Sequence, residues 1–300
     1  MQTLIKDTTA YKIFSADAQS GRLSHAYMLH FADRRNLRSA LKIFAAAFFG
    51  EGCLARIESE SLTDLTIFPA PGKKITAEGV SRIIEDSALR PVECDKKLYI
   101  IDCFDDASAL VQNKLLKTLE EPLSGVHFLL GVTGLAPVLD TVRSRVKLLE
   151  IPPFSKEQIF SALQRGGENG LNAAAASSSN GILGDAQNMV EGGWFESVRA
   201  AAKEICFTVR ISDIAPVSVK HGDIKYRQEL LSEMRNIYFS ALTDGGKLST
   251  LLTKHTIIFA LEELNRANAD VKFNAFFQGL LYDFVLKVVK ENDRWQRLQE

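Results

Sequence analysis

The amino-acid sequence predicts an α/β module with a parallel sheet, followed by all-helical segments. The first half alternates short apolar runs with amphipathic stretches, the pattern of buried strands joined by crossover helices. Pro152–Pro153 interrupts this alternation, and Ser155–Gln158 reads as a capping box that opens a new helix. Because only helical periodicity recurs beyond that point, we expect the sheet module to end near residue 153.

Five apolar runs have the length and boundaries of buried strands, since they are too short for helices and end at polar or turn residues. The predicted strands are Ser24–His30, Asp64–Phe68, Leu98–Ile101, Val126–Val132 and Val146–Ile151. The helices predicted around them are Thr8–Ser20, Arg34–Phe49, Thr76–Ser87, a helix containing Val111–Leu119 that Pro122 stops, and Ala136–Thr141. Three longer amphipathic helices are predicted near the end, at Ile224–Leu242, Leu248–Ala267 and Val271–Lys290.

The composition argues against several classes of protein. The formal net charge is −1, so any DNA contact should be local rather than spread over the whole surface. Four cysteines include no CxxC pair and the histidines show no HExxH spacing, so we expect no metal site. No apolar run is long enough for a membrane span and no signal-peptide core opens the chain, which predicts a cytoplasmic protein without membrane contact.

The stretch from Leu98 to Val146 carries a family resemblance. Its run QNKLLKTLEEP, from Gln112 to Pro122, with Ser144–Arg145 downstream, resembles the bacterial DNA polymerase III clamp-loader family, an AAA+ family. That family includes an ATP-hydrolysing subunit and a subunit called delta prime. The resemblance implies a RecA/AAA+-like parallel sheet module over residues 1–153, a small helical lid domain over 154–208 and a C-terminal helical collar over 209–300 that serves oligomerisation.

The phosphate loop distinguishes the two kinds of subunit. A P-loop needs glycines whose backbone N–H groups surround phosphate, a lysine for the outer phosphates and a hydroxyl for magnesium. By alignment with the family, its glycines have become His30, Asp33 and Arg35, its lysine Asn36 and its hydroxyl residue Leu37. Asp33 would repel phosphate, so the resemblance implies a degenerate P-loop and no bound cofactor. The alternative is that Arg34 and Arg35 replace the lysine and hold nucleotide.

Two further positions depart from the active members of the family. The family's Walker B strand ends in Asp followed by a Glu that orients the attacking water, and here Asp102 is followed by Cys103. Asp102 is then a capping or turn residue. In the Gly50–Arg56 segment, where the family usually carries a zinc module, Cys53 is the only cysteine. Asp185 falls near the place where active relatives have a phosphate-sensing arginine, a third mismatch for ATP.

Ser144 and Arg145 match the family's Ser-Arg-Cys motif, whereas Val146 replaces the cysteine. In the family the arginine of this motif reaches the terminal phosphate of ATP held by the neighbouring subunit. An arginine finger places a planar, permanently charged donor against the charge that develops on the transferred phosphoryl group. The resemblance therefore implies that Arg145 acts in trans with Ser144 in support. Position alone allows a simpler interpretation, in which Arg143 and Arg145 stabilise a helix C-terminus.

The resemblance as a whole implies a delta prime-like subunit that binds no ATP and catalyses nothing by itself. It would stand in a hetero-oligomeric ring with the gamma/tau ATPase and delta subunits, within a DNA polymerase (nucleotidyltransferase) holoenzyme. The ring would load the sliding clamp onto primed DNA. Two alternatives are a divergent active ATPase of the same fold and a scaffold protein without a role in clamp loading. The apolar stripe of the last helix is expected to be core first and partner surface second.

Overall fold

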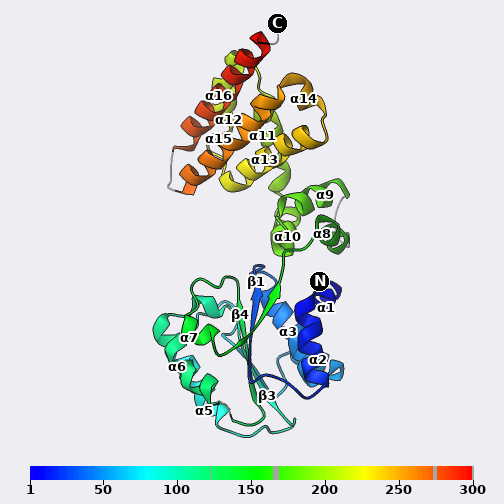
Figure 1. The fold of residues 1–300 in the computed structure, drawn as a ribbon, viewed down its shortest axis with the longest axis vertical. Coiled ribbons are helices and arrows are strands. Elements are labelled where there is room, and N and C mark those ends of the chain that lie inside the picture. Colours follow the sequence, from blue (N-terminus) through cyan, green and yellow to red (C-terminus); the bar gives the residue numbers. More distant parts are fainter. Residues whose placement is uncertain (122, 165–168, 273–275, 299–300) are drawn as a thin grey trace. The chain divides into compact units, whose positions relative to one another are not determined.

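A computed structural model describes residues 1–121, 123–164, 169–272 and 276–298 (Figure 1). The chain forms two compact units. One comprises Met1–Ala162 with Gly181–Asp185, and the other comprises Leu163–Asn180 with Ala186–Glu300. The division falls within α8 and within α10, and the three-domain organisation remains a prediction.

The first unit contains the RecA/AAA+-like parallel sheet that the sequence predicts. The strands are β1 Ala26–Phe31, β2 Leu65–Phe68, β3 Lys97–Ile101, β4 Val126–Val132 and β5 Lys147–Ile151. Their order in the sheet is β2-β3-β4-β1-β5, and all pairs are parallel. Each predicted strand is thus present, with small shifts at its ends. Since parallel strands share one carboxyl edge, the residues that follow β1, β3 and β4 gather at that edge.

Helices cover both faces of this sheet, α1–α3 on one side and α5–α7 on the other (Figure 1). Their bounds are α1 Gln2–Asp7, α2 Thr9–Gln19, α3 Leu37–Phe49, α4 Leu54–Glu58, α5 Ala77–Ser87, α6 Ala109–Glu120 and α7 Asp140–Arg143, with single 3₁₀ turns at η1 Glu51–Cys53 and η2 Phe104–Asp106. Met28, Tyr99 and Phe128 belong to the buried cluster that also contains Leu115 of α6. On the opposite face α3 packs so closely that a Cβ on Gly131 would lie 2.6 Å from Cδ1 of Leu41.

In the sheet unit, two helices begin three or more residues later than predicted. Helix α3 begins at Leu37 rather than at Arg34, because the preceding residues form a turn that Asp33 closes. Helix α7 begins at Asp140 rather than at Ala136, and Leu139 before it is extended. Helix α6 ends at Glu120, as expected for a stop at Pro122, but Pro122 itself lies outside the described residues.

The second unit is helical. Its helices, with the two that lie at the division, are α8 Lys156–Leu163, α9 Asn169–Ser178, α10 Leu183–Glu191, α11 Phe195–Cys206, α12 Ile211–His221, α13 Arg227–Thr243, α14 Lys247–Leu251, α15 Lys254–Lys272 and α16 Phe277–Arg297. Helix α12, which contains Pro216, was not among the predicted helices. No described helix combines the length and apolar character that a membrane span requires.

The predicted last helix, Val271–Lys290, was wrong in its start. Helix α15 continues to Lys272, α16 begins only at Phe277, and Phe273 of the predicted apolar stripe lies outside the described residues. Phe276 is 73% exposed, whereas Leu281, Phe284 and Val288 are buried in the core of the unit. The stripe is therefore mainly core packing, as predicted.

Gln112 explains why α7 starts late. This side chain is 1% exposed and its amide is fully engaged. Its Nε2 donates to the carbonyl oxygens of Ala107 and Pro137, at 2.9 and 3.0 Å, and its Oε1 accepts from the Leu139 N–H at 2.9 Å. These bonds fix the turn that ends at Val138 and the extended Leu139 against the first turn of α6, so a helix can begin only after them.

We expect Gln112→Ala to lower the free energy of unfolding by about 2–4 kcal/mol, because it leaves two carbonyls and one N–H without their buried partner. The measurement is the urea midpoint followed by circular dichroism. Asn113→Ala is the matched control, since Asn113 is the exposed neighbour on the same helix, and its midpoint should stay near that of the wild type. Equal midpoints for both variants would contradict the role given to Gln112.

Candidate functional site

The turn between β1 and α3 is built around the carboxylate of Asp33. This side chain is 1% exposed. Its Oδ1 accepts from the backbone N–H of Asn36 at 3.1 Å, and its Oδ2 accepts from Asn36 Nδ2 at 2.8 Å and from the backbone N–H of Gly184 at 2.7 Å. The carboxylate of Asp33 thus places an anion of the chain itself at the start of α3, where it binds the backbone N–H of Asn36.

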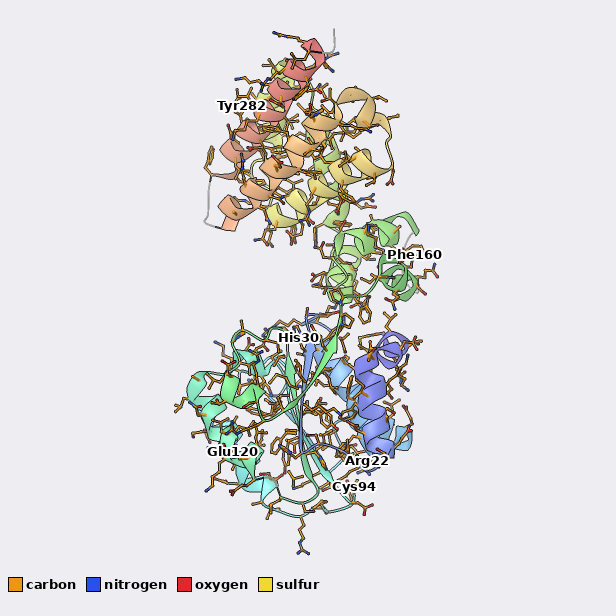
Figure 2. All side chains as sticks on the ribbon, viewed as in Figure 1. Arg22, His30, Cys94, Glu120, Phe160 and Tyr282 are labelled. Atoms are coloured by element: carbon orange, nitrogen blue, oxygen red, sulfur yellow. The ribbon has the colours of Figure 1, made fainter. Side chains whose placement is uncertain are left out.

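The other predicted phosphate-loop residues point to different places. His30 lies at the end of β1 (Figure 2), and its Nδ1 is 3.2 Å from Oε1 of Glu150 on β5. Leu37 is fully buried in the core, and Asn36 is 8% exposed beside Asp33. Arg35 also has interactions within the chain. The structure therefore brings Asp33 and Asn36 together. His30 instead contacts Glu150 on the neighbouring strand, and Leu37 packs in the core.

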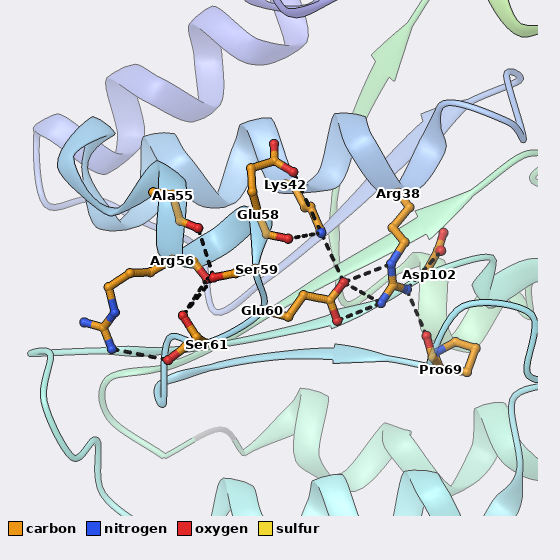
Figure 3. A network of polar contacts seen from close by, with 10 residues as sticks. All are labelled: Arg38, Lys42, Ala55, Arg56, Glu58, Ser59, Glu60, Ser61, Pro69 and Asp102. Atoms are coloured by element: carbon orange, nitrogen blue, oxygen red, sulfur yellow. Dashed lines mark hydrogen bonds and ion pairs between the residues drawn. The ribbon is translucent and has the colours of Figure 1, made fainter.

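Arg34 and Arg38 extend from the same turn and the start of α3 toward the neighbouring strand ends. Arg34 forms an ion pair with Asp106, which lowers the pKa of that carboxyl below its usual value. Arg38 donates to both carboxylate oxygens of Glu60 at 3.0 and 3.1 Å, to the carbonyl of Pro69 at 2.9 Å, and lies 3.4 Å from Oδ2 of Asp102 (Figure 3). Both guanidinium groups are thus neutralised by carboxylates of the same unit.

The tip of β3 shows what replaces an Asp-Glu pair. Asp102 pairs with Arg38, and the Cys103 thiol donates to Oδ1 of Asp102 at 3.5 Å. Burial raises the pKa of Cys103 to about 12, so its thiol is neutral at pH 7 and a poor base. Nearby, Oδ2 of Asp105 accepts from the Thr133 hydroxyl at 2.6 Å and from the N–H groups of Thr133 and Gly134 at the end of β4. Asp102 is therefore an ion-paired residue here, where a capping or turn role was predicted.

A cleft of about 620 Å³ adjoins these groups. Its lining residues are Arg34, Arg38, Pro69, Ala70, Pro71, Gly72, Lys73, Lys74, Ile75, Asp102, Cys103 and Asp106. Lys73 and Lys74 are exposed on the loop after β2. With Arg34 and Arg38 internally paired, these two lysines carry the cleft's remaining positive charge.

Arg145 lies between α7 and β5 and is held against α6. One guanidinium nitrogen donates to the carbonyl of Thr141 at 2.7 Å and to Oγ of Ser144 at 3.2 Å. The other is 2.5 Å from Oε1 of Glu120, which Figure 2 labels on α6, and 34% of the Arg145 side chain is exposed. Ser144 thus contacts Arg145 directly, and Val146 packs beside the core cluster. These contacts orient the guanidinium, and about a third of the Arg145 side chain remains exposed to solvent.

The sequence analysis did not single out several residues of the site. The internal contacts involve Arg38, Glu60, Asp106 and Gln112, and only Gln112 belongs to the run from Gln112 to Pro122 that resembles the family. Spacing could not have found Glu60, which is 22 residues from Arg38 and reaches it only through the fold. Among the described residues no group of three or more His, Cys, Asp or Glu side chains could hold a metal ion.

The α/β unit coincides with a region that a protein-family model matches. Residues 6–155 match the family described as "DNA polymerase III, delta subunit", and this region is half of the chain. The chain belongs to this family of DNA polymerase III clamp-loader subunits. The match covers β1 to β5 and therefore includes Asp33, Asp102 and Arg145.

Two relatives of the chain are subunits of DNA polymerase III. DNA polymerase III subunit delta' of Bacillus subtilis is 30% identical over 158 residues, 49% of this chain and 48% of that protein. DNA polymerase III subunit gamma of Buchnera aphidicola subsp. Schizaphis graminum is 32% identical over 121 residues, 38% of this chain and 33% of that protein. The chain thus spans about half or less of the curated relatives that it matches.

Two solved structures have a course of the chain that is similar in part. A gamma subunit-related protein of Thermotoga maritima has a TM-score of 0.46 at 14% identity, covering 92% of this chain and 98% of that one. The clamp loader delta protein of Bacillus subtilis has a TM-score of 0.37 at 11% identity, covering 93% and 99%.

We expect Asp33→Ala to lower the free energy of unfolding by about 2–4 kcal/mol, because two backbone N–H groups and one amide lose their buried acceptor. Gly184→Ala should also destabilise, since its Cβ would lie 2.3 Å from Oδ1 of Asp33. Urea denaturation of each variant measures both effects.

The double variant Asp33→Ala/Gly184→Ala provides the sharper comparison. Its cost should be smaller than the sum of the two single costs, because removal of the carboxylate also removes the closest clash and leaves only Cβ of Arg35, at 2.8 Å from the new Cβ. Gly52→Ala is the control, since nothing lies within 4 Å of a Cβ at that glycine. Additive costs would refute the contact between residues 33 and 184.

Proposed function

We propose that this clamp-loader family member is a delta prime-like subunit, which binds no ATP itself and supplies Arg145 as an arginine finger to a neighbouring ATPase subunit. The single observation that carries the first part is the buried Asp33 carboxylate. It accepts from the backbone N–H of Asn36, directly before α3, where a phosphate would need donors, and from the N–H of Gly184. A nucleotide would have to displace this carboxylate from its donors or bind against its negative charge.

Further contacts support the loss of ATP binding and hydrolysis. Arg34, which could have replaced the missing lysine, is paired with Asp106, and Arg38 is paired with Glu60 and Asp102. A neutral thiol at Cys103 cannot orient water as a carboxylate does. Nucleotide binding would therefore have to compete with several internal ion pairs at once, as well as with Asp33.

The geometry of Arg145 supports action in trans. Its guanidinium is held by Ser144 and by the carbonyl of Thr141, so it is pre-oriented, and it is exposed enough to meet another chain. Glu120 is its partner in the free chain. On assembly, the terminal phosphate of ATP in the neighbouring subunit would compete with Glu120 for the same donors, and its greater charge would favour it.

The assembly that this role requires follows from the family. We infer partners of the gamma/tau and delta type in a hetero-oligomeric ring located in the cytoplasm. The ring, fuelled by ATP bound elsewhere, would place the sliding clamp on primed DNA as part of the polymerase holoenzyme. The chain by itself would catalyse no reaction.

One observation favours a second candidate, a divergent ATPase that still holds nucleotide. The cleft of about 620 Å³ beside Asp102 has room for an anion, and Lys73 and Lys74 could attract one. In this alternative the phosphates would lie on the β2 side of the usual loop. A scaffold without a clamp-loading role is the third candidate.

Isothermal titration of the isolated chain with ATP and magnesium separates the first two candidates. We expect a Kd for ATP of no less than about 1 mM, which corresponds to a binding free energy no stronger than about −4 kcal/mol. An ATPase subunit of the same family, titrated under the same conditions, is the positive control. Micromolar binding that Lys73→Ala/Lys74→Ala abolishes would establish the second candidate instead.

Replacement of Arg145 by alanine tests the finger. In a ring reconstituted with the ATPase and delta subunits, we expect Arg145→Ala to lower DNA-stimulated ATP hydrolysis by about tenfold or more, because arginine fingers contribute roughly 10³-fold or more to the rate. Ring assembly, followed by gel filtration, should be unchanged.

Arg143→Ala is the matched control. Arg143 lies two positions away, is also a surface arginine and is paired with Asp140 at 3.2 Å. Its replacement should leave hydrolysis within about twofold of the wild type. Equal rates for Arg145→Ala and the wild type would rule out the finger, and failure of the chain to enter the ring would favour the scaffold.

A further inference from the structure

The helical unit contains a small polar pocket of about 230 Å³. Its lining residues are Asn180, Gln228, Leu231, Ser232, Arg235, Leu264, Asn265 and Asn268. All of them belong to the second unit, so the pocket is independent of the phosphate-loop site and of the role proposed for Arg145. No acidic residue is among them.

Helical spacing brings these side chains together. Gln228, Leu231 and Arg235 lie at i, i+3 and i+7 on α13, and Leu264 and Asn268 lie at i and i+4 on α15. Helices α13 and α15 pack against each other, and Leu231 and Leu264 are 3% and 2% exposed. The pocket therefore has an apolar floor between two helices and a polar rim.

The rim carries polar groups with no partner. In the described part of the chain, Arg235 and Asn268 are half-buried and their side chains make no hydrogen bond or ion pair, whereas the amides of Asn180, Gln228 and Asn265 are exposed to solvent. The Ser232 hydroxyl is buried without a hydrogen-bond partner. A buried hydroxyl usually has a partner, since an unsatisfied buried polar group costs about 1–3 kcal/mol.

Other polar groups of the same unit are satisfied. Glu263, 6% exposed, is paired with Arg266 and with Lys287 at 3.0 Å. Asn292, 5% exposed, accepts from the Thr253 N–H and donates to the Leu251 carbonyl, both at 3.1 Å. Glu263 and Asn292 are thus paired, whereas the buried hydroxyls of Ser218 and, in the pocket, of Ser232 have no hydrogen-bond partner.

We propose that this pocket binds a carboxylate group. Arg235 offers a planar fork of donors that fits two carboxylate oxygens, and the surrounding amides can donate further hydrogen bonds. One guanidinium balances one negative charge, whereas a phosphate dianion would remain partly uncompensated. A carboxylate can come from an acidic side chain of a partner polypeptide or from a small free acid, and both present the same two oxygens.

Titration of the full chain with N-acetyl-glutamyl amide tests the site. The readout is the side-chain Nε–H resonance of Arg235 in nitrogen–proton correlation spectra, assigned by comparison with Arg235→Lys. We expect saturable binding with a Kd of about 1–10 mM, as befits a single charged contact. N-acetyl-glutaminyl amide, which lacks the charge, should bind at least tenfold more weakly.

Variants show whether Arg235 is responsible. Arg235→Gln should weaken binding at least tenfold with an unchanged urea midpoint, because the guanidinium has no partner to lose in the free chain. Arg235→Lys keeps the charge without the fork and should weaken binding severalfold. Arg294→Gln, at a 71% exposed side chain on α16, is the control and should bind as the wild type does.

The source of the carboxylate is read from a parallel titration with sodium acetate. Equal affinity for acetate and the glutamyl amide supports a site for small acids, and at least threefold tighter binding of the amide supports an acidic side chain. Tighter binding of inorganic phosphate than of either carboxylate would overturn the proposal. So would unchanged binding in Arg235→Gln, or the absence of any response at Arg235.

Discussion

The carboxylate of Asp33 is the constraint on which the turn between β1 and α3 depends. A buried anion is costly unless donors surround it, and here two backbone N–H groups and one amide do so. Because the turn occupies the preceding residues, α3 begins only at Leu37. Residue 184 approaches the carboxylate so closely that a side chain there would clash with it. In the function that we propose, this internal anion gives the loop the order that a bound phosphate gives elsewhere.

Internal pairing is the common rule at the carboxyl edge of the sheet. Arg34, Arg38, Asp102 and Asp106 would be available to a nucleotide and its metal if they stood alone, but each has a partner within the unit. Such pairs are worth little individually when exposed, yet together they compete with any ligand that needs the same charges. Arg235 in the helical unit differs from these two arginines, since it is half-buried and no described residue forms an ion pair with it.

The run of residues that identifies the family mainly serves the structure. Gln112 binds residues 137 and 139 ahead of α7, Leu115 lies in the core, and Glu120 meets Arg145. A chain of contacts therefore leads from α6 through the start of α7 to the guanidinium. If Arg145 acts on a neighbouring ATP, its position depends on this buried glutamine and on Glu120 of α6 as well as on Thr141 and Ser144 of its own segment.

The sequence by itself determined the five strands, their parallel class and the family, because period, length and a distinctive run are local properties of the chain. It also singled out Asp33 and Arg145 as unusual residues. Only the tertiary structure decided the partners of these two residues, Gly184 for Asp33 and Glu120 for Arg145. It likewise decided that Arg38 pairs with Glu60. The helix start at Asp140 was missed for the same reason, since the hydrogen bonds of Gln112 to the preceding residues override local helical preference.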